Sequence, residues 1–176
     1  MATTAKTKAA QAAGRKSRSA PPLGASTDAI ALLEADHRQV DAYFDDFEAS
    51  ADDREKKLIA DRICLALKVH TQIEEELLYP AAREETGDDD LLDEAQVEHA
   101  GAKTLIVQIE AMRPGQPLYD AKVKVLGEQV RHHIEEEESE LFPELRDTDI
   151  DLDALGAKLA TRKAELMASF APTAND

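Results

Sequence analysis

The chain is poor in the residues that make cross-links, tight turns and large aromatic cores. Among its 176 residues there are one cysteine, seven glycines, no tryptophan and only 4% aromatic side chains. The lone Cys64 excludes a disulfide within the chain, so a reducing compartment, the cytoplasm, fits the sequence best. Few aromatic residues together with 33% charged residues favour long solvated helices over a β-sheet.

Long hydrophobic runs are also absent, and the charge is strongly of one sign. No apolar stretch reaches the roughly 18 residues that a membrane span needs, and no apolar segment typical of a secretory signal follows the first residues. We therefore expect a soluble protein with no membrane partner. The formal net charge is −16. Because nucleic acids are also negative, we expect that the folded part does not bind them.

Residues 1–26 differ from the rest of the chain in charge. They contain five basic residues and no acidic one, so the remaining residues carry a net charge of −21. Ala, Ser, Thr and Pro21-Pro22 fill most of the segment, which cannot bury enough apolar surface to fold by itself. We predict a disordered, solubilising tail. Contact with nucleic acid and an organelle transit peptide are the alternatives.

The rest of the chain shows helical periodicity. Apolar residues spaced by three and four predict four amphipathic helices within residues 27–147 and a fifth within 148–171. The first is expected to begin near Ser26-Thr27-Asp28, a cluster of N-cap residues, and the second around Asp52-Asp53, whose charge suits a helix N-terminus. Pro80 is expected to kink or end the second helix. With short connections, the sequence predicts an all-α fold. It would be an up-down-up-down four-helix bundle with an additional C-terminal helix packed on it and the disordered tail before it.

Six polar side chains interrupt the apolar stripes. A histidine and a glutamate four residues apart lie on one helix face, and two such pairs occur, each ten residues before a proline. A lone histidine on an apolar face is more often a core residue, and acidic runs such as Glu75-Glu76 and Glu135-Glu136 are usually solvated. Six polar groups on the core-facing stripes would be costly without a common partner. We therefore predict a metal site made of His37, His70, Glu74, His99, His133 and Glu137.

The residue types narrow the choice of metal. No cysteine lies at a ligand position, and calcium and magnesium prefer oxygen ligands, so iron, manganese and zinc remain. Six side chains are too many for one tetrahedral zinc ion. Two ions that share the carboxylates would use every group and leave open positions, and open positions on iron indicate oxygen chemistry.

The sequence resembles the hemerythrin-like, or HHE cation-binding, family from about Ile30 to Arg146. The family pattern is found in order in Glu34-x-x-His37, His70-x3-Glu74-Glu75-x3-Tyr79-Pro80, Glu98-His99 and His133-x3-Glu137-Glu138-x3-Phe142-Pro143. The resemblance implies a four-helix bundle with a non-haem di-iron centre, two iron ions joined by an oxo or hydroxo bridge. It also implies that the six residues above are the ligands and that Glu74 and Glu137 bridge the ions.

One departure from the family pattern bears on function. Lys103 stands where the oxygen-carrying members have a second histidine, and both Glu137 and Glu138 are available as carboxylates in the last motif. The sequence therefore disfavours a simple oxygen carrier. Three hypotheses remain: a protein that binds or senses dioxygen or a related small molecule, a redox enzyme acting on peroxide or nitric oxide, and a zinc-holding or metal-free interaction protein. A monomer and a homodimer are both compatible with the sequence.

Overall fold

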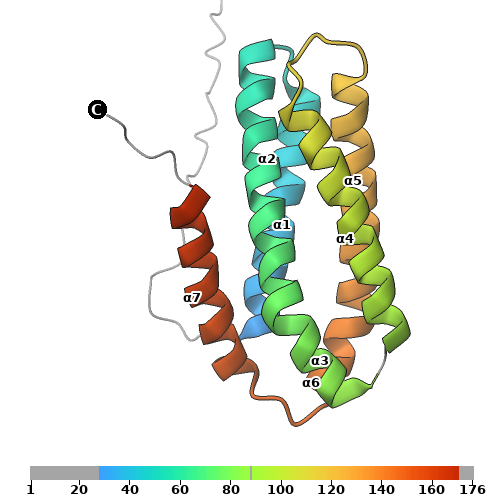
Figure 1. The fold of residues 1–176 in the computed structure, drawn as a ribbon, viewed down its shortest axis with the longest axis vertical. Coiled ribbons are helices and arrows are strands. Elements are labelled where there is room, and N and C mark those ends of the chain that lie inside the picture. The colour runs from blue at the N-terminus through green and yellow to red at the C-terminus, as the bar shows by residue number, and fades with distance from the viewer. Residues whose placement is uncertain (1–27, 88, 171–176) are drawn as a thin grey trace, which may run out of the picture.

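The computed structural model describes residues 28–87 and 89–170, and its regular elements there are all helices. Four long helices run alternately up and down: α1 (Ala29–Ala49), α2 (Asp53–Ile73), α4 (Asp89–Glu110) and α5 (Tyr119–Glu136) (Figure 1). Each packs against its neighbours around the bundle. The predicted all-α bundle is confirmed, whereas the predicted tail, residues 1–26, lies outside the described residues.

The first two helices begin where the sequence places their caps. The Asp28 carboxylate accepts a hydrogen bond from the Ala31 backbone N–H at 2.8 Å, and the Asp52 carboxylate accepts one from the Glu55 N–H at 2.8 Å. Each bond satisfies a backbone donor that has no partner inside the helix. Gly87, with φ of +69°, ends the third helical segment in the left-handed conformation.

Pro80 does not end the second helix. A π-helical turn, η1 (Glu74–Leu78), leads into α3 (Tyr79–Thr86), and the Tyr79 N–H donates to the Glu74 carbonyl five residues back. The wider turn accommodates a proline that lacks a donor and would crowd the preceding turn. The helix changes direction here, as Figure 1 shows. The same arrangement recurs in η2 (Glu137–Leu141) and α6 (Phe142–Arg146), which carries the chain past Pro143.

The apolar core is divided into two clusters along the bundle. One contains Ile30, Leu33 and Ile73 near one end, and the other contains Val40, Phe44 and Ile63 nearer the opposite end. His37 lies between Leu33 and Val40 on α1, so it sits at the boundary of the two clusters. The bundle thus has a polar layer between two apolar ones.

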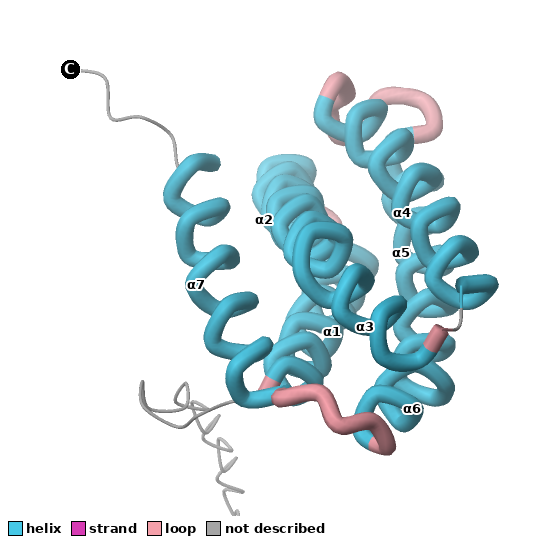
Figure 2. Tube along the Cα trace, turned by 60° about the horizontal axis from the view of Figure 1, so that its bottom comes forward, coloured by secondary structure: helices cyan, strands magenta, loops and turns pink. Residues whose placement is uncertain are grey.

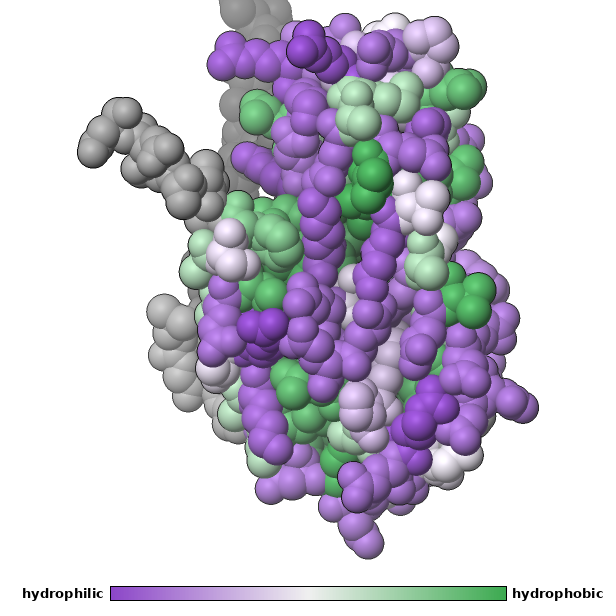
Figure 3. All heavy atoms as spheres, in the orientation of Figure 1, coloured by the Kyte–Doolittle hydropathy of each residue, from purple (hydrophilic) through white to green (hydrophobic). Residues whose placement is uncertain are grey.

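The C-terminal helix α7 (Leu152–Phe170) lies outside the bundle, against α1 and α2 (Figure 2). Its Leu155, Leu159 and Leu166 are buried in the first apolar cluster. The face in Figure 3 is mostly hydrophilic, with hydrophobic atoms gathered where α7 lies beside α2. None of the helices within the described residues is both long and apolar enough to cross a membrane.

Two helical glycines should respond oppositely to alanine. A methyl carbon at Gly127 of α5 would lie 3.0 Å from one carbon of the buried Phe44 ring and 3.3 Å from two more. At Gly101 of α4 such a carbon would lie 3.9 Å from the Gln129 side-chain oxygen, an ordinary van der Waals contact. Alanine gains about 1 kcal/mol in helix propensity, but overpacking costs about 1–3 kcal/mol.

We therefore expect Gly127→Ala to lower the free energy of unfolding by about 1 kcal/mol and Gly101→Ala to raise it by about 0.5–1 kcal/mol. Urea denaturation of both variants beside the unsubstituted protein measures this. A Gly127→Ala protein as stable as Gly101→Ala would contradict the tight contact between α1 and α5.

Candidate metal centre

The polar layer brings side chains from every helix of the bundle to one place. The buried polar and charged side chains of the described residues are Thr71 and the six predicted from the sequence, His37, His70, Glu74, His99, His133 and Glu137. Each of the six is 93% or more buried. The helical spacing that put the histidines and glutamates on the core-facing stripes therefore predicted their burial correctly.

One half of the layer is built from α1 and α2. His37 Nε2 and His70 Nε2 lie 3.1 Å apart, and His70 Nε2 lies 3.0 Å from Glu74 Oε1. Glu137, from the far side of the bundle, brings its Oε2 to 3.3 Å from His37 Nε2. These four residues offer ligand atoms that all lie within 4.8 Å of one another, the spacing expected of a metal site.

The other half mirrors the first and is built from α4 and α5. His99 Nε2 and His133 Nε2 also lie 3.1 Å apart. The second oxygen of Glu74, Oε2, is 3.4 Å from His99 Nε2, and Glu137 Oε2 is 3.5 Å from His133 Nε2. Glu74 therefore points one oxygen into each half, and Glu137 Oε2 faces an imidazole of both. The two carboxylates are placed to be shared.

The facing Nε2 atoms of His99 and His133 are placed to bind one cation together. His99 Nδ1 lies 3.0 Å from Glu75 and His133 Nδ1 lies 2.8 Å from Glu98. In the neutral rings that a metal requires, each Nδ1–H donates to its carboxylate and both Nε2 atoms turn lone pairs toward the same point, 3.1 Å apart. Two nitrogen ligands at right angles, each about 2.1 Å from one ion, lie about 3.0 Å apart. The spacing fits a shared cation.

Unpaired oxygens in the same place support that fit. Both carboxylate oxygens of Glu74 and Oε2 of Glu137 are fully buried and have no hydrogen-bond partner within the described part of the chain. They are close to imidazole nitrogens but not in hydrogen-bonding geometry. Since a buried carboxylate without partners is costly, the residues present suit bound metal.

Proton binding compensates for these charges in the metal-free site. Burial by itself lowers the pKa of His70, but Glu74 and Asp36 outweigh it and raise this pKa to about 10. Burial is likewise outweighed at His133, where Glu137 and Glu98 raise the pKa to about 9. At Glu137 burial is opposed by the surrounding imidazoles, which lower its pKa to about 2. His99 keeps a lowered pKa because burial prevails there.

A second ring of carboxylates backs the imidazoles from outside. Glu138 Oε1 lies 2.8 Å from His37 Nδ1, and Asp36 Oδ2 lies 3.7 Å from His70 Nδ1. Glu75 lies at His99 and Glu98 at His133 in the same way, so each imidazole has one carboxylate at its Nδ1 side. The four carboxylates come from four different helical elements. Such partners fix the tautomer and orientation of histidine ligands.

This outer ring corrects one expectation and adds residues that the sequence did not single out. Glu75 was expected on a solvated face, but it is partly buried and also accepts hydrogen bonds from Lys103 at 2.6 Å. Glu138 lies outside the Nε2 cluster, whereas Glu137 lies within it. Asp36 is the residue that sequence reasoning missed. Its only signal was that it precedes His37, as Glu98 precedes His99.

The two halves differ at the aromatic residue that follows each π-turn. The Tyr79 hydroxyl donates to Glu137 Oε1 at 3.0 Å and lies 3.3 Å from His99 Nε2. The matching residue of the other half, Phe142, stacks on His37 with ring centroids 5.8 Å apart and offers no hydroxyl. The second half therefore holds a buried proton donor that the first half lacks. Burial raises the pKa of Tyr79 well above its usual value.

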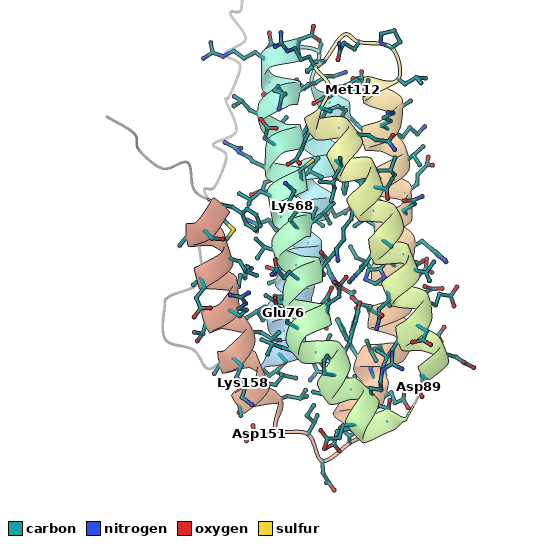
Figure 4. The ribbon with its side chains drawn as sticks, in the orientation of Figure 1. Lys68, Glu76, Asp89, Met112, Asp151 and Lys158 are labelled. Carbon is teal, nitrogen blue, oxygen red and sulfur yellow. The ribbon has the colours of Figure 1, made fainter. Side chains whose placement is uncertain are left out.

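A cavity of about 290 Å³ touches all four buried histidines. Val40, Leu67 and Ala102 give it an apolar wall, and Gln129 and the exposed His132 line it on the α4 and α5 side. Water's share of liquid volume is about 30 Å³, so the cavity has room for a small molecule beside the cluster. In Figure 4 the side chains crowd into the space that the four helices enclose.

Comparison with known proteins gives a consistent result. The family model of the hemerythrin HHE cation binding domain matches residues 28–145. A "DNA nickase" from a Nostoc species is 32% identical over 115 residues, which make up 65% of this chain and only 32% of that relative. The crystal structure of a hemerythrin HHE cation binding domain-containing protein from Mycobacterium kansasii superposes with a TM-score of 0.69 at 25% identity. It covers 81% of this chain and 88% of that one.

Proposed function

The chain belongs to the hemerythrin HHE cation-binding domain family and binds metal cations, and from this we propose that its buried cluster is a di-iron centre that binds or senses dioxygen or a related small molecule. We propose His37, His70, His99 and His133 as the terminal ligands and Glu74 and Glu137 as the bridging ones. The observation that best supports a two-ion site is that Glu74 points one buried oxygen without a hydrogen bond at each half of the cluster.

Iron is the metal that this set of ligands favours, with manganese and zinc as the alternatives. Nitrogen and carboxylate ligands suit all three, but six side chains exceed the four ligands of a structural zinc site. Two iron ions would supply reversible redox chemistry toward oxygen and nitrogen ligands. Apolar clusters border the layer on both sides, and the cavity beside the histidines has room for a small molecule.

A redox enzyme acting on peroxide or nitric oxide is the second candidate, and Tyr79 favours it. Its hydroxyl lies inside the cluster, hydrogen-bonded to Glu137 and close to His99. It can hold a proton where a reacting oxygen atom would need one. Turnover of peroxide or nitric oxide faster than free iron would support the enzyme, and an iron-loaded protein without it would support the sensor.

The activity of the Nostoc relative does not carry over to this proposal. The aligned segment is about a third of that protein, and the net charge of −16 opposes contact with a phosphate backbone. We propose that dioxygen, another diatomic molecule or peroxide is the partner of residues 27–147. Residues 148–171 would then be an amphipathic helix packed on that bundle, and the protein would act in the cytoplasm as a monomer or homodimer.

Elemental analysis with an optical spectrum in air tests the proposal. Protein produced with adequate iron should hold two iron ions per chain, and its near-ultraviolet absorption should change when reduced protein is exposed to dioxygen. One zinc ion per chain, or iron that chelators remove as easily as adsorbed iron, would contradict a di-iron centre. Zinc under iron-replete conditions would favour the interaction-protein hypothesis.

A further inference from the structure

We propose that Lys163 of α7 is a positioning residue of the metal centre, which acts through Asp36 on the imidazole of His70. The proposal rests on the proposed function, because it takes His70 to be a metal ligand. It concerns a helix that begins after residue 145, where the family match ends. The C-terminal helix would then be part of the site and more than a cover on the bundle.

The contacts run without a break from α7 to the cluster. The Lys163 ammonium donates a hydrogen bond to Asp36 Oδ1. The other oxygen of the same carboxylate, Oδ2, faces His70 Nδ1 at 3.7 Å. His70 Nε2 in turn lies 3.0 Å from Glu74 and 3.1 Å from His37 Nε2. The Asp36 side chain is only 13% exposed, so its two oxygens have little contact with solvent.

His70 is the exception among the four imidazoles. The Nδ1 atoms of His37, His99 and His133 lie 2.8–3.0 Å from a carboxylate oxygen. His70 Nδ1 is buried and has no hydrogen bond to any described residue. Its carboxylate is the one that is tied to α7. Because Lys163 engages Asp36 from outside the bundle, it determines how closely that carboxylate can approach the ring.

The structure also shows α7 closing the outer side of His70. A cavity of about 210 Å³ lies among α1, α2 and α7. Asp36, His70 and Lys163 all line it, together with Met167 and apolar residues of α2. Without α7 this space would lose one of its walls beside His70. Lys163 thus lines the same space as the pair that it is proposed to position.

A neighbouring residue provides the matched control. Arg162 holds α7 to the bundle through hydrogen bonds to Glu76, at 2.7 and 3.2 Å, and it contacts no partner of a histidine. Glu76 is labelled in Figure 4, on the helix beside α7. Both basic residues anchor the helix, but only Lys163 reaches Asp36. Comparing Lys163→Met with Arg162→Met therefore separates an effect on the metal centre from a loosening of α7.

The experiment measures how fast Fe²⁺ passes without oxygen from the loaded protein to a ferrous chelator. Mutation of an outer partner of a ligand typically costs about 10- to 100-fold in metal affinity. We expect the faster-leaving ion to leave about tenfold faster in Lys163→Met and in Asp36→Asn, and Arg162→Met to stay within about twofold of the unsubstituted protein. Lys163→Arg should restore slow release, and Lys163→Met with Asp36→Asn should be no faster than either alone.

A spectroscopic readout accompanies the rates. In protein loaded with Zn²⁺, the Nδ1–H proton resonance of His70 should shift in Lys163→Met and not in Arg162→Met. Equal rates and equal shifts in the two variants would overturn the role of Lys163 while leaving the di-iron proposal standing. If the unsubstituted protein retained no ion, or if His70→Ala changed nothing, both proposals would fall.

Discussion

Replacing His133 with alanine should remove about one of the two proposed ions, whereas replacing the adjacent His132 should leave metal content unchanged. His133 is buried and brings its Nε2 to 3.1 Å from His99 Nε2. His132 points outward with its side chain 62% exposed. The two residues are neighbours of the same type, so their comparison tests which of the two imidazoles faces the cluster. Loss of even an outer partner costs about 10- to 100-fold in affinity, so loss of His133 should cost at least about 100-fold.

The test measures the metal content per chain of each variant after dialysis against a weak chelator. Circular dichroism of both variants must show the same helix content, since an unfolded His133→Ala protein would lose metal for another reason. His132 Nε2 lies 3.3 Å from Glu136 and 3.9 Å from Glu98, and replacing it leaves the closer contact of Glu98 with His133 Nδ1, at 2.8 Å, in place. Equal losses in the two variants would contradict the assignment of His133, and with it the two-ion cluster.

The six core-facing residues could be predicted because helical periodicity alone fixes which face they share. His70 and Glu74, four residues apart, had to point the same way, and burial made them costly unless they met a common partner. Periodicity says nothing about how far one helix is rotated or shifted against another. Asp36 and Glu98 face imidazoles of other helices, so their roles depend on contacts between helices that the sequence of one helix cannot specify.

In the fold, too, local features could be predicted from the sequence and features that depend on neighbouring turns could not. The starts of the first two helices follow from local chemistry and were predicted correctly, and the structure identifies Asp28 and Asp52 as the capping residues. Pro80 was expected to kink or end its helix, and the helix bends there but runs on to Thr86. Proline removes one backbone donor, but whether the helix stops depends on the adjacent turn. The π-helical turns start at Glu74 and Glu137, the two residues proposed as bridges, so the extra residue in each turn also sets how each carboxylate enters the layer.

Metal should stabilise the protein more as the pH rises, because the metal-free site binds protons that the metal must displace. The raised pKa values of His70 and His133, about 10 and about 9, mean that their protonated forms stabilise the metal-free fold. That contribution is complete below the ordinary histidine value of about 6.5. It is lost as the pH rises through 9 to 10. The ionised Glu137, with its pKa lowered to about 2, stabilises the fold at every pH above about 4.5. This contribution is lost only as the pH falls toward 2.

Bound metal has the opposite dependence, since it requires neutral imidazoles. At a free metal concentration about 1,000 times the dissociation constant the gain is about 4 kcal/mol, or roughly 10 °C in melting temperature for a chain of this size. We expect a gain of that order with Zn²⁺ at pH 8 and a much smaller one at pH 5.5, with about two protons released per chain on loading at neutral pH. Calorimetric melting with and without the ion measures the gain. In His132→Ala the pH dependence should persist. A gain as large at pH 5.5 as at pH 8 would mean that the ion does not displace the protons of His70 and His133, and so does not bind at their imidazoles.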